Sequence, residues 1–368
     1  MKRALLSVTD KTGVVDFAKG LVELGFSILS TGGTRRALLE GGVEAEEVAD
    51  YTGFPEMMDG RIKTLHPRVH GGLLSRRDVA AHGEAMRQHG IDHIDVLGVN
   101  LYRFRETVRK PGASREDIVE NIDIGGPAMI RSAAKNHASV AVVVDPKDYA
   151  KVLGAMREHG GAVPQDLAGQ LAAKAFAHTA AYDAAIAQWF DGERRGRPGE
   201  PFFAERVTVT GEKLQDLRYG ENPHQEAAFY GTGEAPSLAA AKQLGGKELS
   251  YNNILDADAA LQMALEFEQP CCILVKHNNP CGAAVAETLT RAFELALTGD
   301  PVSAFGGIFA ANRPFDRATA AAVVASGTFL EVIVAPSVEP AAMAELKQAK
   351  WGGNVRVLEL DGLPDEAT

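Results

Sequence analysis

The stretch Phe26-Ser27-Ile28-Leu29-Ser30-Thr31-Gly32-Gly33-Thr34 predicts the architecture of the first half of this chain. Its first four residues form an apolar run with strand character, and residues 35–40 begin a helical pattern. A strand, a glycine turn and a helix N-terminus in succession point backbone N–H groups at a phosphate. The two glycines let the backbone approach the ligand, and the hydroxyl groups of Ser30, Thr31 and Thr34 add donors.

Two further segments have the character of anion-binding loops. Ser7-Val8-Thr9-Asp10-Lys11-Thr12 follows the apolar run Ala4-Leu5-Leu6 and precedes a periodic helix. Asp59-Gly60-Arg61-Ile62-Lys63-Thr64-Leu65-His66-Pro67 sets Arg61 and Lys63 side by side, as recognition of an anion requires. A solvated basic turn explains that loop equally well when it is taken alone. The three loops together favour a phosphorylated small molecule as the ligand.

Composition excludes several classes of function. The chain has 368 residues, so more than one domain is expected, and its 45% hydrophobic and 24% charged residues are ordinary for a soluble globular protein. The net charge of −11 argues against a nucleic-acid partner. The three cysteines have neither zinc-site nor disulfide spacing, so a reducing cytoplasm is the expected compartment. No signal peptide or membrane span is expected. A proline between His66 and His70 argues against a metal pair there.

A charged run rich in glycine and proline divides the chain at 191–201. We therefore predict a first domain at 1–190, a linker at 191–201 and a second domain at 202–368. In the first domain, apolar strand patterns alternate with helical ones, which predicts an α/β fold with a parallel sheet covered by helices on both faces. The predicted strands are 4–8, 26–29, 95–100 and 139–145, and the predicted helices include 13–24, 127–136 and 165–189.

Ligands of such sheets bind at the carboxyl ends of the strands. Ser7, Ser30 and Asn100 all fall at predicted strand ends, and Tyr102 follows closely. The turn Asn121-Ile122-Asp123-Ile124-Gly125-Gly126-Pro127 opens a helix that carries Lys135. Each of these polar residues also has a plain structural interpretation, since aspartate caps helices, tyrosine packs in cores and lysine is usually solvated.

These segments resemble the bifunctional purine-biosynthesis enzymes that join AICAR transformylase to IMP cyclohydrolase. In the first half the resemblance rests on residues 7–13, 30–34 and 60–67, on Val99-Asn100-Leu101-Tyr102, and on Asp123-Ile124-Gly125-Gly126 with Ala134-Lys135-Asn136-His137. In the second half it rests on residues 218–225, on Leu249-Ser250-Tyr251-Asn252-Asn253, on Lys276-His277-Asn278-Asn279-Pro280-Cys281-Gly282 and on residues 300–307. It covers essentially the whole chain.

For the first domain, the resemblance implies a methylglyoxal-synthase-like parallel sheet that closes the ring of FAICAR, a ribonucleotide monophosphate, to give IMP and water without a cofactor. Lys63 with Thr64 is assigned to the reacting carboxamide. Tyr102, Asp123 and Lys135 are assigned to the formyl side, as oxyanion stabilisation and proton relay. The residues expected to hold the phosphate are Ser7, Lys11, Ser30, Thr31, Gly32, Gly33, Thr34 and Arg61, and the other expected substrate contacts are Asn100, Gly125 and Gly126.

For the second domain, the resemblance implies an α/β, cytidine-deaminase-like transformylase. It passes a formyl group from the co-substrate 10-formyltetrahydrofolate to AICAR. His277 matches the general base on the AICAR amine, and Lys276 matches its catalytic partner. Arg218 and Tyr219 are expected to bind substrate, and a homodimer is expected.

The family normally continues beyond the point where this sequence stops, so the transformylase domain is expected to be incomplete. Three explanations are open: a shortened chain, a separate chain that supplies the missing lobe, or a protein that keeps only cyclisation. The cyclohydrolase is expected to be self-sufficient, and this chain alone is not expected to transfer formyl groups. The alternatives from other classes are a methylglyoxal-synthase-like lyase acting on a triose phosphate and a non-catalytic nucleotide-binding subunit.

Overall fold

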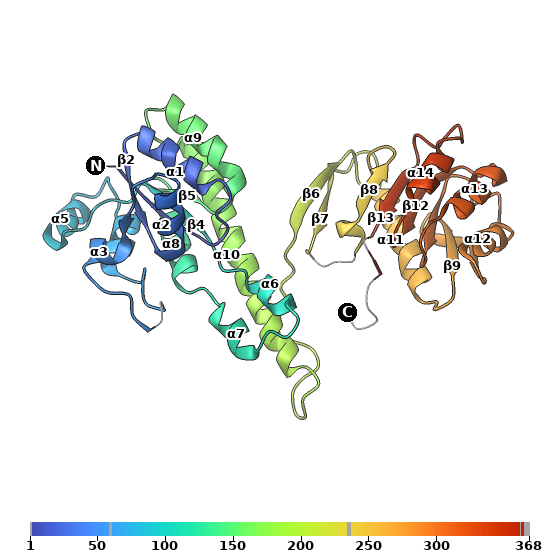
Figure 1. The fold of residues 1–368 in the computed structure, drawn as a ribbon, viewed down its shortest axis with the longest axis horizontal. Helices are drawn as coiled ribbons and strands as arrows, with labels where there is room; N and C mark the ends of the chain where they lie inside the picture. The colour runs from blue at the N-terminus through green and yellow to red at the C-terminus, as the bar shows by residue number, and fades with distance from the viewer. Residues whose placement is uncertain (1, 59–60, 234–236, 361, 364–368) are drawn as a thin grey trace. The chain divides into compact units, whose positions relative to one another are not determined.

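The computed structural model describes residues 2–58, 61–233, 237–360 and 362–363. The chain divides into two compact units, Met1–Thr208 and Val209–Thr368 (Figure 1). Each unit has its own sheet and its own hydrophobic core.

The described residues of the first unit form a five-stranded parallel sheet in the order β3-β2-β1-β4-β5. Its strands are β1 (Lys2–Val8), β2 (Phe26–Ser30), β3 (Glu46–Glu47), β4 (Val96–Asn100) and β5 (Ala141–Val143). Leu6 pairs with Ser30 and Val8 with Asn100, so the carboxyl ends of the three central strands lie level at one edge. The parallel sheet expected from the alternating pattern is confirmed. The sequence did not predict β3, because two glutamates carry no apolar signal.

Helices cover both faces of this sheet. The helix α1 (Val14–Glu23) packs on β2 and on α9 (Tyr149–Glu158), whereas α8 (Gly125–Lys135) packs on β4, on β5 and on α4 (Pro67–Leu74). Right-handed crossovers place α1 and α2 (Gly32–Glu40) on the opposite face from α4 and α8. The central strand segment Ala4-Leu5-Leu6 is fully buried, as expected for a strand with helices on both sides.

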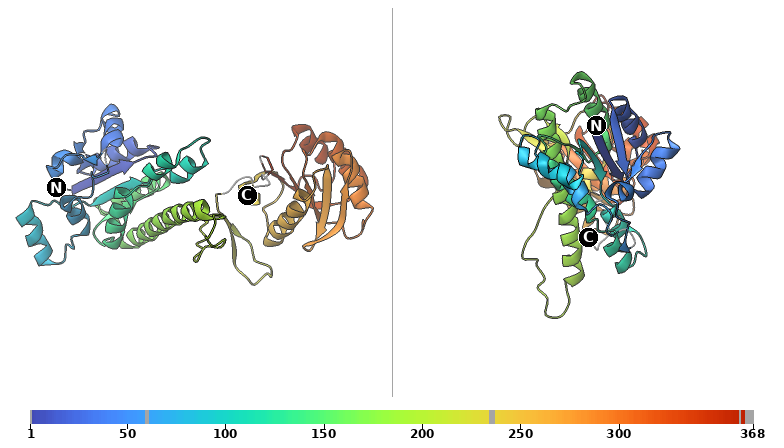
Figure 2. Two further views of the ribbon diagram at one scale, coloured as in Figure 1. Left: turned by 90° about the horizontal axis from the view of Figure 1, so that it is seen from below. Right: turned by 90° about the vertical axis from the view of Figure 1, so that its left-hand side faces the viewer.

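The helix α10 (Gln165–Arg194) is the longest in the described part of the chain. Figures 1 and 2 show it in light green, running beside the sheet and on to α6 (Phe104–Arg109) and α7 (Arg115–Glu120). It continues four residues into the predicted linker at 191–201, where Arg115 forms an ion pair with Glu193 at 3.1 Å. The charged residues that suggested a linker are therefore in part the solvated face of a helix. The remaining short helices of this unit are α3 (Val48–Thr52), α5 (Ala80–His89) and η2 (Pro146–Asp148).

The second unit contains a six-stranded mixed sheet in the order β10-β9-β11-β12-β13-β8 and a separate two-stranded ribbon. The sheet consists of β8 (Lys242–Gly245), β9 (Cys271–Lys276), β10 (Asn279–Val285), β11 (Gly307–Ala311), β12 (Leu330–Ala335) and β13 (Arg356–Glu359). The ribbon consists of β6 (Glu212–Leu217) and β7 (Ala227–Gly231). The helical elements are η3 (Leu238–Ala240), α11 (Tyr251–Leu265), α12 (Leu289–Leu297), α13 (Arg317–Ser326) and α14 (Pro340–Leu346).

Alternation along β9 explains the two cores of this unit. Cys271, Ile273 and Val275 face the core that includes α11, whereas Cys272 and Leu274 face the core that includes α12, α13 and α14. Burial raises the pKa of the Cys271 thiol to about 11, which fits an unreactive core residue. The predicted α/β class is thus confirmed in both units. No helix in the described ranges is long and apolar enough to cross a membrane.

Candidate functional site

The loops after β1 and β2 meet at the carboxyl edge of the first sheet. The Ser7 and Thr31 hydroxyl oxygens lie 2.7 Å apart. The Ser30 hydroxyl donates to the Leu6 carbonyl at 2.7 Å, and the Thr34 hydroxyl accepts from the Val8 amide at 2.9 Å and donates to its carbonyl at 3.0 Å. Ser30 and Thr34 are also buried, so the predicted direct contact of their hydroxyls with a phosphate does not fit their geometry. They instead hold the two loops together.

The N-terminus of α2 provides the anion-binding geometry that the glycine turn predicts. Thr31 is its N-cap residue and makes no side-chain cap, and Gly32 has a φ of +39°. A Cβ atom at Gly32 would lie 3.1 Å from the Lys63 ammonium, and one at Gly33 would lie 3.8 Å from that of Lys11. The ammonium groups of Lys63 and Lys11 thus lie close to the uncapped first turn of α2. The helix dipole also favours negative charge there.

The loop before α4 supplies Arg61, Lys63 and Thr64, while Asp59 and Gly60 of the same predicted motif lie outside the described residues. Arg61 forms an ion pair with Glu120, and the Lys63 ammonium donates to Glu56 at 2.6 Å. Both glutamates are about half exposed, so solvent screens these pairs and an anionic ligand can replace them.

Two glycines bring the start of α8 close to its neighbours. A Cβ atom at Gly125 would lie 2.5 Å from the Thr64 hydroxyl oxygen. One at Gly126 would lie 2.6 Å from an Asp123 carboxylate oxygen and 2.7 Å from a Leu101 methyl group. Both positions therefore require glycine for close approach, which is a supporting role in the site.

Asp123 and Tyr102 form the titratable pair of the site. The Asp123 carboxylate accepts a hydrogen bond from the Gly126 amide at 2.8 Å. Burial raises the pKa of Asp123, although the Gly126 and Tyr102 amides act in the opposite direction. Burial also raises the pKa of the Tyr102 phenol, and the nearby Asp123 charge adds to that rise. A part-buried carboxyl group with a raised pKa beside a phenol is suited to proton transfer.

Asn100 occupies the end of β4, where it holds the loop after β1. Its amide oxygen accepts from the Thr9 and Asp10 amides at 2.6 and 2.9 Å, and its amide nitrogen donates to the Asp10 carbonyl at 3.0 Å. The Asn100 side chain therefore fixes the conformation of the loop that carries Lys11.

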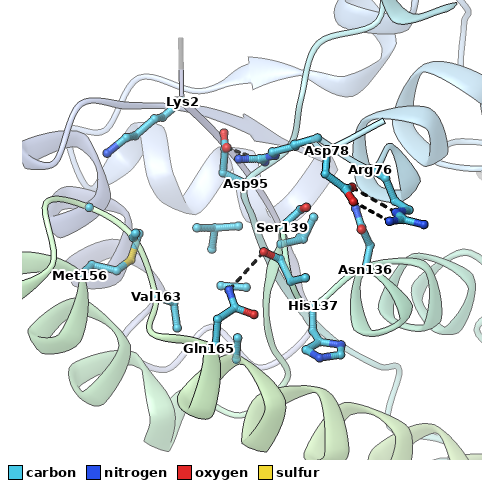
Figure 3. A pocket seen from close by; sticks show the side chains of 18 of the residues that line it. Lys2, Arg76, Asp78, Asp95, Asn136, His137, Ser139, Met156, Val163 and Gln165 are labelled. Atoms are coloured by element: carbon cyan, nitrogen blue, oxygen red, sulfur yellow. Dashed lines mark hydrogen bonds and ion pairs between the residues drawn. The ribbon is translucent and has the colours of Figure 1, made fainter. Parts of the chain in front are cut away.

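Lys135 is the predicted catalytic residue that the structure places elsewhere. It is the last residue of α8, and the 11 residues of that helix span about 16 Å. It lines a pocket of about 1110 Å³ at the amino ends of the strands, together with Lys2, Asp95 and Ala141. Figure 3 shows this pocket with Lys2, Asp95 and His137 around it. The structure thus does not bring Lys135 to Tyr102 and Asp123.

The second unit presents Lys276 and His277 at the end of β9. Lys276 pairs with Asn279 across the β9–β10 hairpin, so His277 and Asn278 are the two turn residues, with φ values of 51° and 62°. Positive φ at both positions is the geometry of a type I′ turn, which normally favours glycine and asparagine. The Lys276 ammonium donates to the Gly306 carbonyl at 2.8 Å, and His277 is exposed. Such a conformation at a histidine supports a functional interpretation of the turn.

Arg218 and Tyr219 directly follow β6, in the part of the unit that forms the ribbon, and Arg218 lies 5.7 Å from the centre of the Tyr219 ring. In the described residues no hydrogen bond or ion pair joins either residue to Lys276 or His277. Within the same ranges, no group of three His, Cys, Asp or Glu side chains is arranged to hold a metal ion.

Sequence reasoning missed Tyr182, whose hydroxyl accepts from the Asp123 amide at 2.9 Å. No local signal marks this residue, since 59 positions separate it from Asp123 and it lies within a long helix.

Comparison with known proteins gives matches over both units. The model of the AICARFT/IMPCHase bienzyme family matches residues 133–368, and that of the MGS-like domain matches residues 13–128. A bifunctional purine biosynthesis protein PurH from Oceanobacillus iheyensis is 54% identical over 99% of this chain and 69% of its own length. The protein of the same name from Magnetococcus marinus is 53% identical over 99% of this chain and 68% of its own length. A solved structure described as "Crystal structure of ForH" is 39% identical and covers 55% of this chain and 100% of its own, with a TM-score of 0.49.

Proposed function

This chain belongs to the AICARFT/IMPCHase bienzyme family of purine biosynthesis, and from that premise we propose that its first unit converts FAICAR to IMP. The lyase alternative is not favoured, because the family match over residues 133–368 extends through the whole second unit. The observation that supports the proposal most strongly is the placement of Asp123, a part-buried carboxyl group with a raised pKa at the carboxyl edge of a sheet whose neighbouring loops have the geometry expected of a phosphate site.

The reaction sets the requirements for this site. The carboxamide nitrogen attacks the formyl carbon, and the new C–N bond leaves negative charge on the formyl oxygen. The carboxamide nitrogen loses one proton and the formamide nitrogen loses another, and both leave with that oxygen as water. The nitrogen is a poor nucleophile, so orientation, stabilisation of the oxyanion and proton transfer must all be supplied.

The described residues can supply each of these. The first turn of α2, with Ser7, Thr31 and Lys11, holds the phosphate. Lys63 lies beside that turn and is assigned to the carboxamide. The Asp123 carboxylate accepts a proton from nitrogen, and the Tyr102 phenol donates a hydrogen bond to the oxyanion. Lys135 has no part in this scheme because it lies at the far end of α8.

Turnover of FAICAR by the purified chain tests the proposal. IMP formation is followed by absorbance, with Asp123→Asn as the control for catalysis by this site. We expect IMP formation by the wild type and a loss of at least about 100-fold in the variant, the typical size of a general-base contribution. A wild-type chain that binds IMP and does not cyclise FAICAR would favour the non-catalytic alternative.

The turn at Lys276 and His277 favours formyl transfer as the activity of the second unit. We propose that His277 takes a proton from the AICAR amine and that Lys276, held by the Gly306 carbonyl, polarises the formyl group of 10-formyltetrahydrofolate. Tetrahydrofolate formation from the two substrates measures this activity. His277→Ala should abolish any activity that the wild type shows, and activity that survives in the variant would refute this assignment.

A further inference from the structure

The hydroxyl group of Tyr182 makes two hydrogen bonds to the backbone of one short segment, Asn121 to Asp123. It accepts a hydrogen bond from the Asp123 amide at 2.9 Å and donates one to the Asn121 carbonyl at 3.0 Å. The residues from Asn121 to Ile124 belong to no helix or strand, so they have no hydrogen-bond ladder of their own. Tyr182 therefore fixes the backbone on which the Asp123 carboxylate is mounted.

The same part of α10 also holds the chain on the other side of the site. The Tyr182 ring packs edge-on against Phe104 with centroids 6.2 Å apart, and Phe104 packs edge-on against Trp189 at 6.0 Å. Phe104 begins α6 directly after the Tyr102 segment, and Asp123 follows α7. The segment that contains α6 and α7 therefore contacts the second half of α10 at both of its ends. Tyr102 precedes this segment and Asp123 follows it.

A purely structural role accounts for the ring but not for the placement of the hydroxyl. Phenylalanine would fill the small core around Phe104, Ile118 and Ala185 equally well. The hydroxyl adds two backbone hydrogen bonds, and both fall within three residues of chain that end at Asp123. These two bonds satisfy the hydrogen-bonding capacity of the part-buried phenol hydroxyl. The segment that they hold is the one that must be rigid for the proposed cyclisation, because it carries Asp123.

We propose that Tyr182 is a positioning residue of the cyclisation site, which sets the Asp123 carboxylate for proton transfer by clamping the Asn121–Asp123 backbone to α10. This inference rests on the proposed function of the first unit. It extends the site to α10, through the hydrogen bonds of Tyr182 to the backbone that ends at Asp123. Loss of the hydroxyl should affect the chemical step more than substrate binding, because the phosphate loops of β1 and β2 are held by other contacts.

Tyr182→Phe tests the inference, and Tyr51→Phe is its matched control. The Tyr51 hydroxyl also accepts a backbone hydrogen bond, from the Asp92 amide at 3.1 Å, and Tyr51 is buried in the same unit, where Tyr182 is part-buried. It lies near Arg3 at the start of β1, at the opposite edge of the sheet. Each variant removes one phenolic hydroxyl, with two backbone hydrogen bonds lost at Tyr182 and one at Tyr51.

We expect Tyr182→Phe to lower kcat for IMP formation at least about tenfold with KM within about twofold, because small misplacements of catalytic groups are costly. Tyr51→Phe should keep both values within about twofold of the wild type. A Tyr182→Phe kcat within twofold of the wild type would overturn the inference, as would an equal loss of kcat in both variants.

Hydrogen exchange in the free, full-length protein supplies a readout that does not depend on turnover. The Asp123 amide should exchange faster in Tyr182→Phe than in the wild type and should be unchanged in Tyr51→Phe. Equal exchange in all three proteins would show that the clamp does not exist. A wild-type chain that forms no IMP would instead refute the proposed function, while the exchange result would still decide whether Tyr182 holds this segment.

Discussion

At the residue scale, stability and chemistry make opposite demands on Asp123. Its pKa is raised above the ordinary value of 3.8 because partial burial removes water from the carboxyl group. Between 3.8 and the folded-state pKa, the folded protein therefore binds more protons than the unfolded chain. The free energy of unfolding falls as pH rises through that window, and the cost of the buried charge is fully present above it.

Asp123→Asn should therefore be more stable than the wild type at pH 7 and nearly inactive. The neutral amide can still accept from the Gly126 amide, and it never carries the buried charge. Thermal unfolding at pH 7 should show a higher Tm for the variant, and the difference should shrink as the pH approaches 3.8. A lower Tm at pH 7 would show that the ionised carboxylate stabilises the fold and that its raised pKa is misassigned.

Lys63→Ala and Arg61→Ala should differ in their kinetics. Arg61 is assigned to the phosphate, and removal of one charge-assisted contact costs about 1.5–3 kcal/mol, or about ten- to a hundredfold in affinity. Lys63 lies beside the first turn of α2 and is assigned to the carboxamide, so its loss should lower kcat more than it raises KM. Steady-state kinetics with FAICAR measure both values, and the same profile in both variants would contradict the two roles.

The sequence predicted the positions of single residues better than their exposure. Ser7 and Thr31 lie together at the carboxyl edge of the sheet, and Lys63 lies beside the first turn of α2. The hydroxyls of Ser30 and Thr34 were expected to bind the ligand, and burial against the β1 backbone gives them another role. Exposure depends on the packing of strands that are distant in sequence, so a local motif does not reveal it.

At the element scale, the length of α8 explains why Asp123 and Lys135 lie far apart although both were expected at one site. The helix begins with Gly125 and Gly126, close to Thr64 and Asp123. It ends with Lys135, which lines the pocket at the amino ends of the strands. The two residues are close in sequence, but a helix rises about 1.5 Å for each residue, so the two ends of α8 lie about 16 Å apart. The strands and long helices were predictable from their hydrophobic periodicity, and the clamp by Tyr182 was not, because it depends on where α10 packs.

Gly32→Ala should specifically damage the first turn of α2. A methyl group there would crowd the Lys63 ammonium at 3.1 Å, and the φ of +39° is unfavourable for alanine. We expect at least about a tenfold rise in the Kd for IMP, measured by titration calorimetry. Gly25→Ala is the matched control, since Gly25 has a φ of +85° and no neighbour within 4 Å, so strain alone should lower its Tm and leave its Kd unchanged. Equal Kd values in the two variants would exclude the α2 turn as the phosphate site.

At the scale of the whole molecule, the first unit should be sufficient for cyclisation. Its residues extend to Thr208, beyond the predicted boundary at 190, and the Gln188 side chain donates to the Thr208 carbonyl at 2.9 Å. The glycine- and proline-rich run located the division of the chain only approximately, because composition does not show which residues fold back on a helix. The assignment of one activity to each unit remains a proposal.

A fragment of residues 1–208 should fold and form IMP with a kcat within about twofold of the full chain. A fragment of residues 1–180 should lose most of that activity, because it lacks Tyr182 and the aromatic contacts of Trp189. Circular dichroism and FAICAR turnover check both fragments. An inactive, folded 1–208 fragment beside an active full chain would show that cyclisation requires the second unit.

The position of bound IMP decides whether the carboxyl edge of the first sheet is the active site. A crystal structure of this chain with IMP should place the phosphate at the first turn of α2, with Ser7, Thr31 and Lys11 around it, and the base against Tyr102 and Asp123. Electron density for IMP in the pocket at the amino ends of the strands, beside Lys135 and Lys2, would contradict the account.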